Sequence, residues 1–368
     1  MAEYLDINKA LELREAGCPV IDVRSPKEFD HAHMPGAYSI PLFNNDQRSA
    51  VGIIFKKKGR VAAVQKGLEY VGPKMADMTK EALEITEKLS FKVSTKVISK
   101  ADVNAVIVYC WRGGMRSASM GWLFETVDIK VYLIRGGYKA YRREELELFK
   151  KNYNLTVLGG CTGAGKTDLL YALEKAGEQI IDLEGLANHR GSAFGSIGQE
   201  RQPTSEYFEH LLFDKLRKMD IERNIWIEDE SKNVGRVFVP NSFFTNLRNS
   251  DVIKIQVPES VRAARIIRDY GCFDKEALIY SIKKIEKRLG REKCLQAINC
   301  CNNDDYKGAV EICLYYYDKL YNVSMDKRVL VGIKFITFAI DSLDIESFLP
   351  SLIDQAREME GRKGSKIK

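Results

Sequence analysis

The chain lacks any long uninterrupted run of apolar residues. Of its 368 residues, 45% are hydrophobic and 29% are charged. No stretch reaches the roughly 18 apolar residues that a membrane-spanning helix needs. The first residues, Met1–Asp6, also lack the basic and apolar regions of a signal peptide. This composition is typical of a globular protein, and we expect a cytoplasmic protein without a membrane partner.

A zinc-binding pattern is also lacking. The chain has only four histidines, and its eight cysteines show no pair of CxxC spacings, so a zinc site is not expected. No tightly bound cofactor is expected either. In the cytoplasm the cysteines should be mostly free thiols. They are Cys18, Cys110, Cys161, Cys272, Cys294, Cys300, Cys301 and Cys313.

Positive charge is in modest excess and is clustered. There are 57 Lys and Arg residues against 51 Asp and Glu residues, a net charge of +6. The basic residues gather at Lys56–Arg60, at Arg142 and Arg143, and in the tail from Arg357. Any one of these clusters could be solvated surface. Together they favour a polyanionic partner such as a nucleic acid.

The length predicts two domains, which we place at residues 1–145 and 146–368. In the first, short apolar runs alternate with helical patterns, and this alternation predicts an α/β domain with a parallel sheet. A charged helix is predicted over Arg142–Asn154, between the two domains. The strands predicted in the first domain are Pro19–Arg24, Tyr38–Leu42, Val103–Tyr109 and Lys130–Ile134.

The second domain is predicted to be a further α/β unit with helical additions. Its strands are expected at Leu155–Gly159, Gln179–Asp182, Ile225–Glu228 and Val252–Val257. Its helices are expected at Asp168–Ala176, within Lys275–Tyr321 and at Ile345–Glu360. The basic tail after these helices, residues 361–368, is expected to be frayed.

A cysteine follows the central strand of the first domain. The buried run Ala105–Tyr109 delivers Cys110 to the end of that strand, and a glycine-rich loop follows before a helical pattern begins at Ser117. Backbone N–H groups of such a loop surround anions and favour a thiolate. A buried structural cysteine is the alternative. We predict a nucleophilic sulfur at Cys110, in an anion-binding loop formed by Trp111, Arg112, Gly113, Gly114, Met115 and Arg116.

The second domain opens with a phosphate-binding pattern. Gly160-x4-Gly165-Lys166-Thr167 lies after a predicted strand and before a predicted helix, as a Walker A loop does. Backbone N–H groups of such a loop approach phosphate oxygens, the lysine adds a positive charge, and the threonine hydroxyl is suited to Mg²⁺. The predicted phosphate-binding residues are Gly160, Gly163, Gly165, Lys166 and Thr167.

Further polar residues are candidates for contacts with a substrate or with Mg²⁺. Glu228 and Asp229 lie at the end of a predicted strand, where a Walker B carboxylate lies, although an acidic turn would have the same sequence pattern. Arg262 and Arg265 belong to a row of arginines on a predicted helix, either over phosphates or on a solvated face. The remaining candidates are Asp182 at a strand end and His189 and Arg190 in a polar, glycine-rich loop.

Two families share features of the cysteine loop. Cys110-x5-Arg116-Ser117 satisfies the pattern of phosphotyrosine phosphatases, although Tyr109 stands where those enzymes usually have histidine. The segment Ile21–Phe29, followed by His31–Ala37, instead resembles the rhodanese domain, whose cysteine carries sulfur or selenium. The loop here is one residue longer than in many rhodanese domains, which leaves room for a bulkier group.

The fusion of a rhodanese domain to a phosphate-loop domain resembles the tRNA 2-selenouridine synthase family over roughly residues 10–350. Two of the motifs that carry this resemblance are hard to generate by chance, Arg135–Ala140 and Leu183–Ser192. The resemblance implies a tRNA substrate with 2-thiouridine at the wobble position. It also implies that geranyl diphosphate alkylates the sulfur and that selenophosphate then displaces the geranylthiol. Selenophosphate synthetase is an expected partner.

The residues themselves leave other functions open. One alternative is a Cys-x5-Arg phosphatase fused to a nucleotide-binding domain, and another is a non-catalytic RNA-binding regulator with a vestigial phosphate loop. In the selenium-transfer hypothesis Cys110 handles the chalcogen or positions selenophosphate, and Lys166 and Thr167 hold the diphosphate of the geranyl donor.

Overall fold

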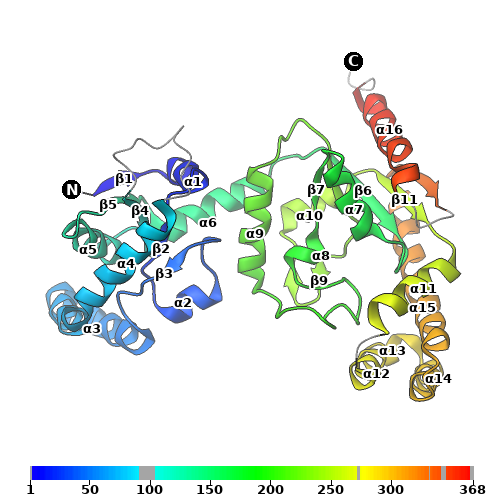
Figure 1. The fold of residues 1–368 in the computed structure, drawn as a ribbon, viewed down its shortest axis with the longest axis horizontal. Helices are drawn as coiled ribbons and strands as arrows, with labels where there is room; N and C mark the ends of the chain where they lie inside the picture. The colour runs from blue at the N-terminus through cyan, green and yellow to red at the C-terminus, as the bar shows by residue number, and fades with distance from the viewer. Residues whose placement is uncertain (1, 91–103, 272–273, 331, 341–344, 365–368) are drawn as a thin grey trace. The chain divides into compact units, whose positions relative to one another are not determined.

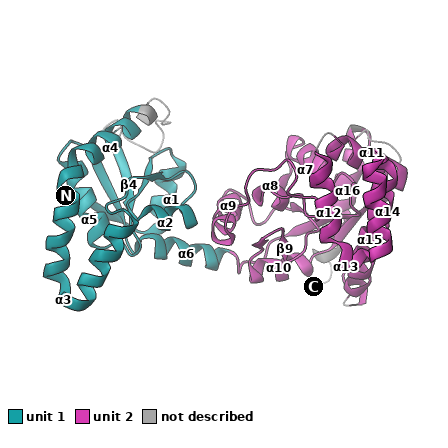
Figure 2. Cartoon of the chain, turned by 90° about the horizontal axis from the view of Figure 1, so that it is seen from below, with its two compact units in different colours: residues 1–148 teal, residues 149–368 magenta. Residues whose placement is uncertain are grey.

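The computed structural model describes residues 2–90, 104–271, 274–330, 332–340 and 345–364. The chain divides into two compact units, residues 1–148 and residues 149–368, which Figure 2 shows in different colours. Each unit has its own parallel sheet and its own hydrophobic core. Within the described ranges, no helix has the length and apolar character required to cross a membrane.

The first unit is built on a five-stranded sheet in the order β1-β5-β4-β2-β3, with all neighbouring strands parallel. The central strand β4 is buried along its whole length, because apolar helices cover it. This explains its continuous run of apolar residues. The strands are β1 (Glu3–Leu5), β2 (Val20–Asp22), β3 (Tyr38–Ser39), β4 (Ala105–Tyr109) and β5 (Lys130–Ile134).

Helices pack in pairs against this sheet (Figure 1). Helices α4 and α5 contribute Met78, Ala82, Met120 and Phe124 to the main core, while α1 and α6 pack on each other and on β5. The helices are α1 (Ile7–Glu15), α2 (Pro26–His31), α3 (Asn45–Val71), α4 (Met75–Ser90), α5 (Met115–Glu125) and α6 (Gly137–Leu148), with a 3-10 turn at Gly72–Lys74.

Helix α3 is interrupted at Gly59. This residue has φ +82° and ψ −175°, a backbone conformation that glycine adopts far more readily than other residues. The break falls inside the basic cluster Lys56–Arg60, all of whose residues are exposed. The cluster is therefore presented to solvent at a bend between two helical segments.

The second unit has a five-stranded parallel sheet in the order β12-β11-β6-β8-β7. The glycine-rich loop follows β6, so it lies at the carboxyl edge of the sheet, where ligands of open α/β sheets bind. The strands are β6 (Leu155–Gly160), β7 (Gln179–Ile181), β8 (Ile225–Glu228), β11 (Val252–Gln256) and β12 (Phe335–Ala339), beside a small hairpin of β9 (Asn233–Val234) and β10 (Val237–Phe238).

The helices of the second unit form two groups. Helices α7 and α16 pack on the sheet core, whereas α12, α14 and α15 share a separate apolar cluster. The helices are α7 (Lys166–Lys175), α8 (Leu183–Leu186), α9 (Ser205–Arg217), α10 (Asn241–Arg248), α11 (Glu259–Tyr270), α12 (Lys275–Lys284), α13 (Glu286–Leu289), α14 (Arg291–Asn302), α15 (Tyr306–Leu330) and α16 (Ile345–Gly364).

The structure confirms the predicted α/β fold class and the main strands. The helix predicted over Arg142–Asn154 is wrong in its second half, because α6 begins earlier and ends at Leu148. Strands β1 and β12, at the sheet edges, were not predicted. Cys272, Val103 and the last residues of the basic tail lie outside the described residues.

Candidate active sites

Cys110 lies directly after β4 and is buried, with 3% of its surface exposed. A second turn packs against its backbone. The N–H of Tyr138 donates to the carbonyl of Cys110 at 2.9 Å, and the N–H of Lys139 donates to that of Trp111 at 3.0 Å. A Cβ at Gly137, which has φ +58°, would lie 2.2 Å from the Cys110 carbonyl oxygen. The glycine pair Gly136 and Gly137 is therefore required for this close approach of two loops.

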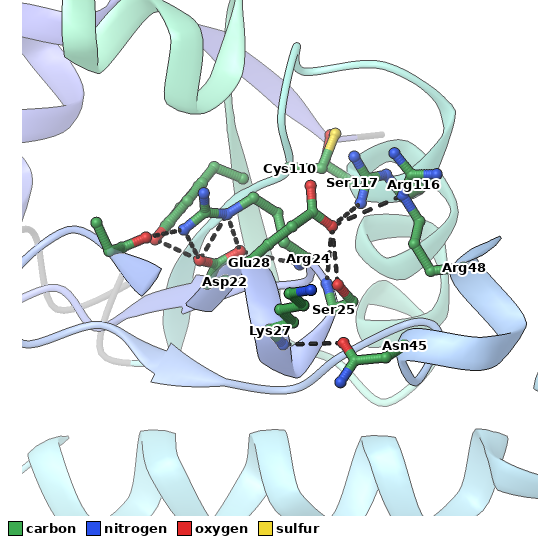
Figure 3. Close-up of polar contacts among 12 residues, drawn as sticks. Asp22, Arg24, Ser25, Lys27, Glu28, Asn45, Arg48, Cys110, Arg116 and Ser117 are labelled. Carbon is green, nitrogen blue, oxygen red and sulfur yellow. Dashed lines mark hydrogen bonds and ion pairs between the residues drawn. The ribbon is translucent and has the colours of Figure 1, made fainter. Parts of the chain in front are cut away.

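The sulfur of Cys110 has a polar neighbour on α5. Its Sγ lies 3.2 Å from the hydroxyl of Ser117, which also donates to the Gly114 carbonyl at 3.0 Å. Figure 3 shows Cys110 and Ser117 beside Arg116 at the start of this helix. The loop thus sets the thiol at the N-terminus of a helix, where the backbone dipole favours negative charge.

Arg116 is held by an acidic residue from α2. Its guanidinium donates to Glu28 at 3.0 Å, and Arg48 approaches the same carboxylate at 3.7 Å (Figure 3). Burial alone would raise the pKa of Glu28, but Arg116 and the backbone N–H of Ser25 outweigh it and hold the pKa below its ordinary value. Arg116 is therefore oriented by an ionised partner.

A network of buried polar side chains contacts β4, the strand that leads to Cys110. Asp22 accepts from the Arg24 guanidinium at 2.7 Å and from the Tyr109 hydroxyl at 2.7 Å, and the Arg24 guanidinium lies 3.8 Å from the centre of the Tyr138 ring. Burial, followed by the charge of Asp22, raises the pKa of Tyr109 well above its ordinary value. Tyr109, in the position of the phosphatase histidine, thus ties β4 to β2.

The outer side of the cysteine loop is open to solvent. Trp111 is 38% exposed and Met115 is 50% exposed, and Arg112 and Gly114 are exposed as well. The Trp111 ring packs beside Tyr138, with centroids 5.5 Å apart. The Gly137 turn closes the inner side of the loop, so the exposed residues of the loop all lie on its outer side.

The phosphate loop of the second unit wraps around the start of α7. Gly163 and Gly165 have φ values of +80° and +82°, which the loop path requires. The ammonium of Lys166 donates to the Gly160 carbonyl at 3.1 Å, and the hydroxyl of Thr167 lies 3.5 Å from the Glu184 carboxylate. The loop therefore has the strand–loop–helix geometry that cradles phosphates.

Three carboxylates converge beside Lys166 and Thr167. They are Glu184, Glu228 and Glu230, and burial is the main cause that raises the pKa of each. Repulsion by neighbouring carboxylates adds to this effect, from Asp182 on Glu228 and from Glu184 on Glu230, whereas Lys166 opposes it at Glu184. One oxygen of Glu228 accepts from the Glu184 N–H at 2.8 Å, while its other oxygen is buried without a hydrogen-bond partner. Within the described ranges, no group of three or more His, Cys, Asp or Glu side chains has the geometry of a metal site.

Two of the acidic candidates have other partners. Asp182 accepts from the Gly185 N–H at 2.7 Å and from the Tyr171 hydroxyl at 2.6 Å, so it caps α8. Asp229 is buried between Arg328 at 2.8 Å and Arg248 at 3.3 Å. Glu184 and Glu230 were not predicted from the sequence as site residues. The positive charge of Lys166 acts on both and opposes the rise that burial causes in their pKa values. The available signal for Glu184 was its place in the motif Leu183–Ser192.

The three arginines in the row on α11 have different surroundings. Arg262 is buried and forms a two-pronged contact with Asp318 at 2.6 and 2.9 Å, and it also donates to the Thr162 carbonyl at 3.1 Å. Arg265 lies against the phosphate loop, because a Cβ at Gly165 would fall within 1.4 Å of its guanidinium. Arg268 is exposed and pairs with Asp269. Arg262 thus braces the loop, and Arg265 is placed to contact a phosphate.

A cavity opens beside the phosphate loop, and the loop that carries His189 and Arg190 borders it. Arg190 lies 5.4 Å from the centre of the Tyr270 ring and lines the cavity with the phosphate loop. His189 is buried, its Nδ1 has no hydrogen-bond partner, and burial lowers its pKa. The structure therefore brings Arg190 and Arg265 together with the phosphate loop, and it leaves Cys110 in the other unit.

Comparisons with known proteins agree with this two-part organisation. A family model for the tRNA 2-selenouridine synthase AAA domain matches residues 153–345, and a rhodanese-like domain model matches residues 6–144. The rhodanese match favours the sulfur-handling interpretation of the cysteine loop over the phosphatase alternative.

Curated relatives named tRNA 2-selenouridine synthase match along most of their length. The protein of Nitrosomonas europaea is 30% identical and the match covers 85% of this chain and 90% of the relative. That of Bdellovibrio bacteriovorus is 32% identical over 92% of this chain and 96% of the relative. That of a Sulfurovum species is 33% identical over 90% and 94%, respectively.

Proposed function

The chain belongs to the tRNA 2-selenouridine synthase family of tRNA-modifying enzymes, and from that premise we propose that its two sites carry out two successive steps on one uridine of tRNA. The observation that carries the proposal is the coexistence of a buried thiol, Cys110, beneath an exposed loop in one unit and a phosphate loop in the other. One step uses a diphosphate substrate and the other uses a chalcogen donor.

The first step is alkylation of 2-thiouridine. The thiocarbonyl sulfur attacks the first carbon of geranyl diphosphate, a C–S bond forms, the C–O bond breaks and pyrophosphate leaves, while the N3 proton of the uridine passes to the pyrophosphate or to water. Lys166, Arg265 and the loop N–H groups neutralise the charge that accumulates on the departing pyrophosphate. Alkylation turns a poor leaving group at the uridine C2 into a good one.

Mg²⁺ fits the polar end of the phosphate site. Mg²⁺ is commonly bound through one or two carboxylates together with substrate phosphates. Thr167 and Glu184 would hold the ion there, beside the unpartnered oxygen of Glu228. The ion would supply additional stabilisation of the pyrophosphate charge, while Lys166 and Arg265 orient the diphosphate.

The second step is selenium transfer. The selenium of selenophosphate bonds to C2 of the uridine, the C–S bond breaks and geranylthiol leaves, and water then cleaves the Se–P bond to release phosphate. Cys110 carries the chalcogen or positions selenophosphate. Arg116, oriented by Glu28, and the N-terminus of α5 stabilise the anion. Supply of selenophosphate by selenophosphate synthetase, in the cytoplasm, is part of the proposal.

Reconstitution tests this function. The purified protein is incubated with tRNA that contains 2-thiouridine, with geranyl diphosphate and with selenophosphate, and the nucleosides are analysed by mass. We expect geranylated 2-thiouridine when selenophosphate is omitted and 2-selenouridine when all three are present. Phosphate release from phosphotyrosine without any nucleoside change would instead support the phosphatase alternative.

A further inference from the structure

The phosphate loop opens into a cavity much larger than a diphosphate. The cavity has a volume of about 840 Å³, and its lining extends from Gly160–Thr167 to helices α12, α14 and α15. Pockets of this size accommodate whole organic ligands. Because the phosphate loop occupies only one end, the rest of the cavity needs an occupant of different chemistry.

One face of α15 runs from the phosphate loop into the distal part of the cavity. Tyr321, Tyr317, Leu314 and Val310 are spaced by four, three and four residues, so they share one helical face, and all four line the cavity. Tyr321 lies at the loop, since a Cβ at Gly159 would come within 2.5 Å of its hydroxyl. From Tyr321 to Val310 the helix rises by roughly 16 Å.

The helix is anchored at the phosphate end by polar contacts. Asp318 binds the Arg262 guanidinium, which in turn holds the Thr162 carbonyl of the loop. The Tyr317 hydroxyl accepts from the Ala193 N–H at 3.1 Å. These contacts fix the distance between the loop and the residues further along α15, so the depth of the cavity is set by the fold.

A second segment lines the cavity with aliphatic side chains. They are Leu278 and Ile282, which share one face of α12, and Ile285, the residue that follows this helix. Val310 and Leu314 of α15 line the same cavity. A nucleobase would need hydrogen-bond partners for its edge, whereas an alkyl chain needs only apolar surface.

We infer that the apolar pocket formed by Leu278, Ile282, Ile285, Val310 and Leu314 binds the hydrocarbon tail of the prenyl donor and selects its length. This inference rests on the proposed function, which places the diphosphate in the phosphate loop. Val310 lies in the distal part of the pocket, one turn from Tyr306, which is the first residue of α15 and also lines the cavity. A change of side-chain size at Val310 therefore changes the depth that is open to the tail.

Calorimetric titration of the full chain with prenyl diphosphates of increasing length tests this inference. Val310→Phe shortens the pocket and should weaken the binding of geranyl diphosphate by about tenfold, which is the effect of a small change of size in an apolar pocket. Inorganic pyrophosphate and dimethylallyl diphosphate should bind as they do to the wild-type chain. Val310→Ala deepens the pocket and should increase the affinity for farnesyl diphosphate relative to that for geranyl diphosphate. Val323→Phe is the matched control, since Val323 is 47% exposed on the same helix and does not line the cavity.

The outcomes separate this inference from the function on which it rests. If the wild-type chain binds geranyl diphosphate but neither Val310 variant changes the length preference, the pocket assignment is wrong and the proposed function stands. If the wild-type chain binds no prenyl diphosphate more tightly than it binds pyrophosphate, the proposed function fails as well. If Val310→Phe weakens the binding of ATP and leaves the binding of geranyl diphosphate unchanged, the pocket binds a nucleoside and the inference is overturned.

Discussion

Glu28 and Arg116 join two distant parts of the first unit at the cysteine loop. The carboxylate of Glu28, on α2, accepts from the guanidinium of Arg116, at the start of α5, at 3.0 Å. Ser25 at the N-terminus of α2 also donates to Glu28, in a capping box. The arginine of the loop is therefore oriented by a carboxylate that is itself fixed by the cap of another helix.

Replacing Glu28 by glutamine should slow selenium transfer by roughly tenfold, because the charged hydrogen bond that orients Arg116 is weakened. The measurement is the rate of 2-selenouridine formation from geranylated tRNA. Geranylation by the second unit should be unchanged, which a general loss of folding would not allow. Asp30→Asn, an exposed change on the same helix, is the control. Unchanged selenium transfer in the Glu28 variant would contradict the positioning role.

The carboxylates beside the phosphate loop should make the second unit less stable as pH rises. The pKa of Glu230 is raised, so the folded state binds more protons than the unfolded state between the ordinary and the raised pKa. Stability from this group is complete below the ordinary pKa and is lost as pH rises through the raised one. Glu230→Gln should therefore raise the melting temperature at neutral pH and have little effect near pH 4. An equal effect at both pH values would contradict this origin, and Glu222→Gln, at an exposed site, is the control.

Lys166→Ala should impair geranylation by roughly ten- to a hundredfold, because a charge-assisted contact with the diphosphate is lost, about 1.5–3 kcal/mol. Selenation of tRNA that already carries the geranyl group should suffer less. The two half-reactions are measured separately by nucleoside mass. Equal damage to both would show that the phosphate loop serves tRNA or the fold as a whole.

Binding of tRNA should weaken steeply with salt. If about five phosphates are neutralised, the slope of log affinity against log salt should be near −3 to −5. Reversing Lys56, Lys57 and Lys58 to glutamate should weaken all tRNAs to a similar degree, because phosphate contacts carry no base information. These lysines are exposed at the bend of α3. A flat salt response, or unchanged affinity in the triple variant, would assign this cluster to solvated surface.

The local sequence predicted the parts of the two sites that lie in one continuous segment. The apolar run before Cys110 predicted β4, and Gly160 to Thr167 predicted the phosphate loop, because each motif combines a strand, a turn and a helix start. The partners of these motifs come from elsewhere in the chain. Glu28 reaches Arg116 from 88 positions away, and no periodicity in the sequence encodes that contact.

The same limit applies to the second unit. The arginine row on α11 was visible as a repeat, but its division into a brace at Arg262 and a loop contact at Arg265 depends on Asp318, which lies on α15. Likewise the helical region Lys275–Tyr321 was predicted without its packing, so the cavity between α12 and α15 could not be anticipated. Short edge strands such as β1 were missed because three residues give no pattern.

The central claim, that the thiol loop and the phosphate loop serve different half-reactions, is tested most directly with Cys110→Ser. A serine hydroxyl is a much weaker nucleophile and chalcogen carrier than a cysteine sulfur, so it cannot replace Cys110, while the change in volume is small. The variant is given 2-thiouridine tRNA, geranyl diphosphate and selenophosphate, and the nucleosides are followed by mass. We predict that geranylated 2-thiouridine accumulates and 2-selenouridine does not form. Normal formation of 2-selenouridine would contradict the assignment of Cys110.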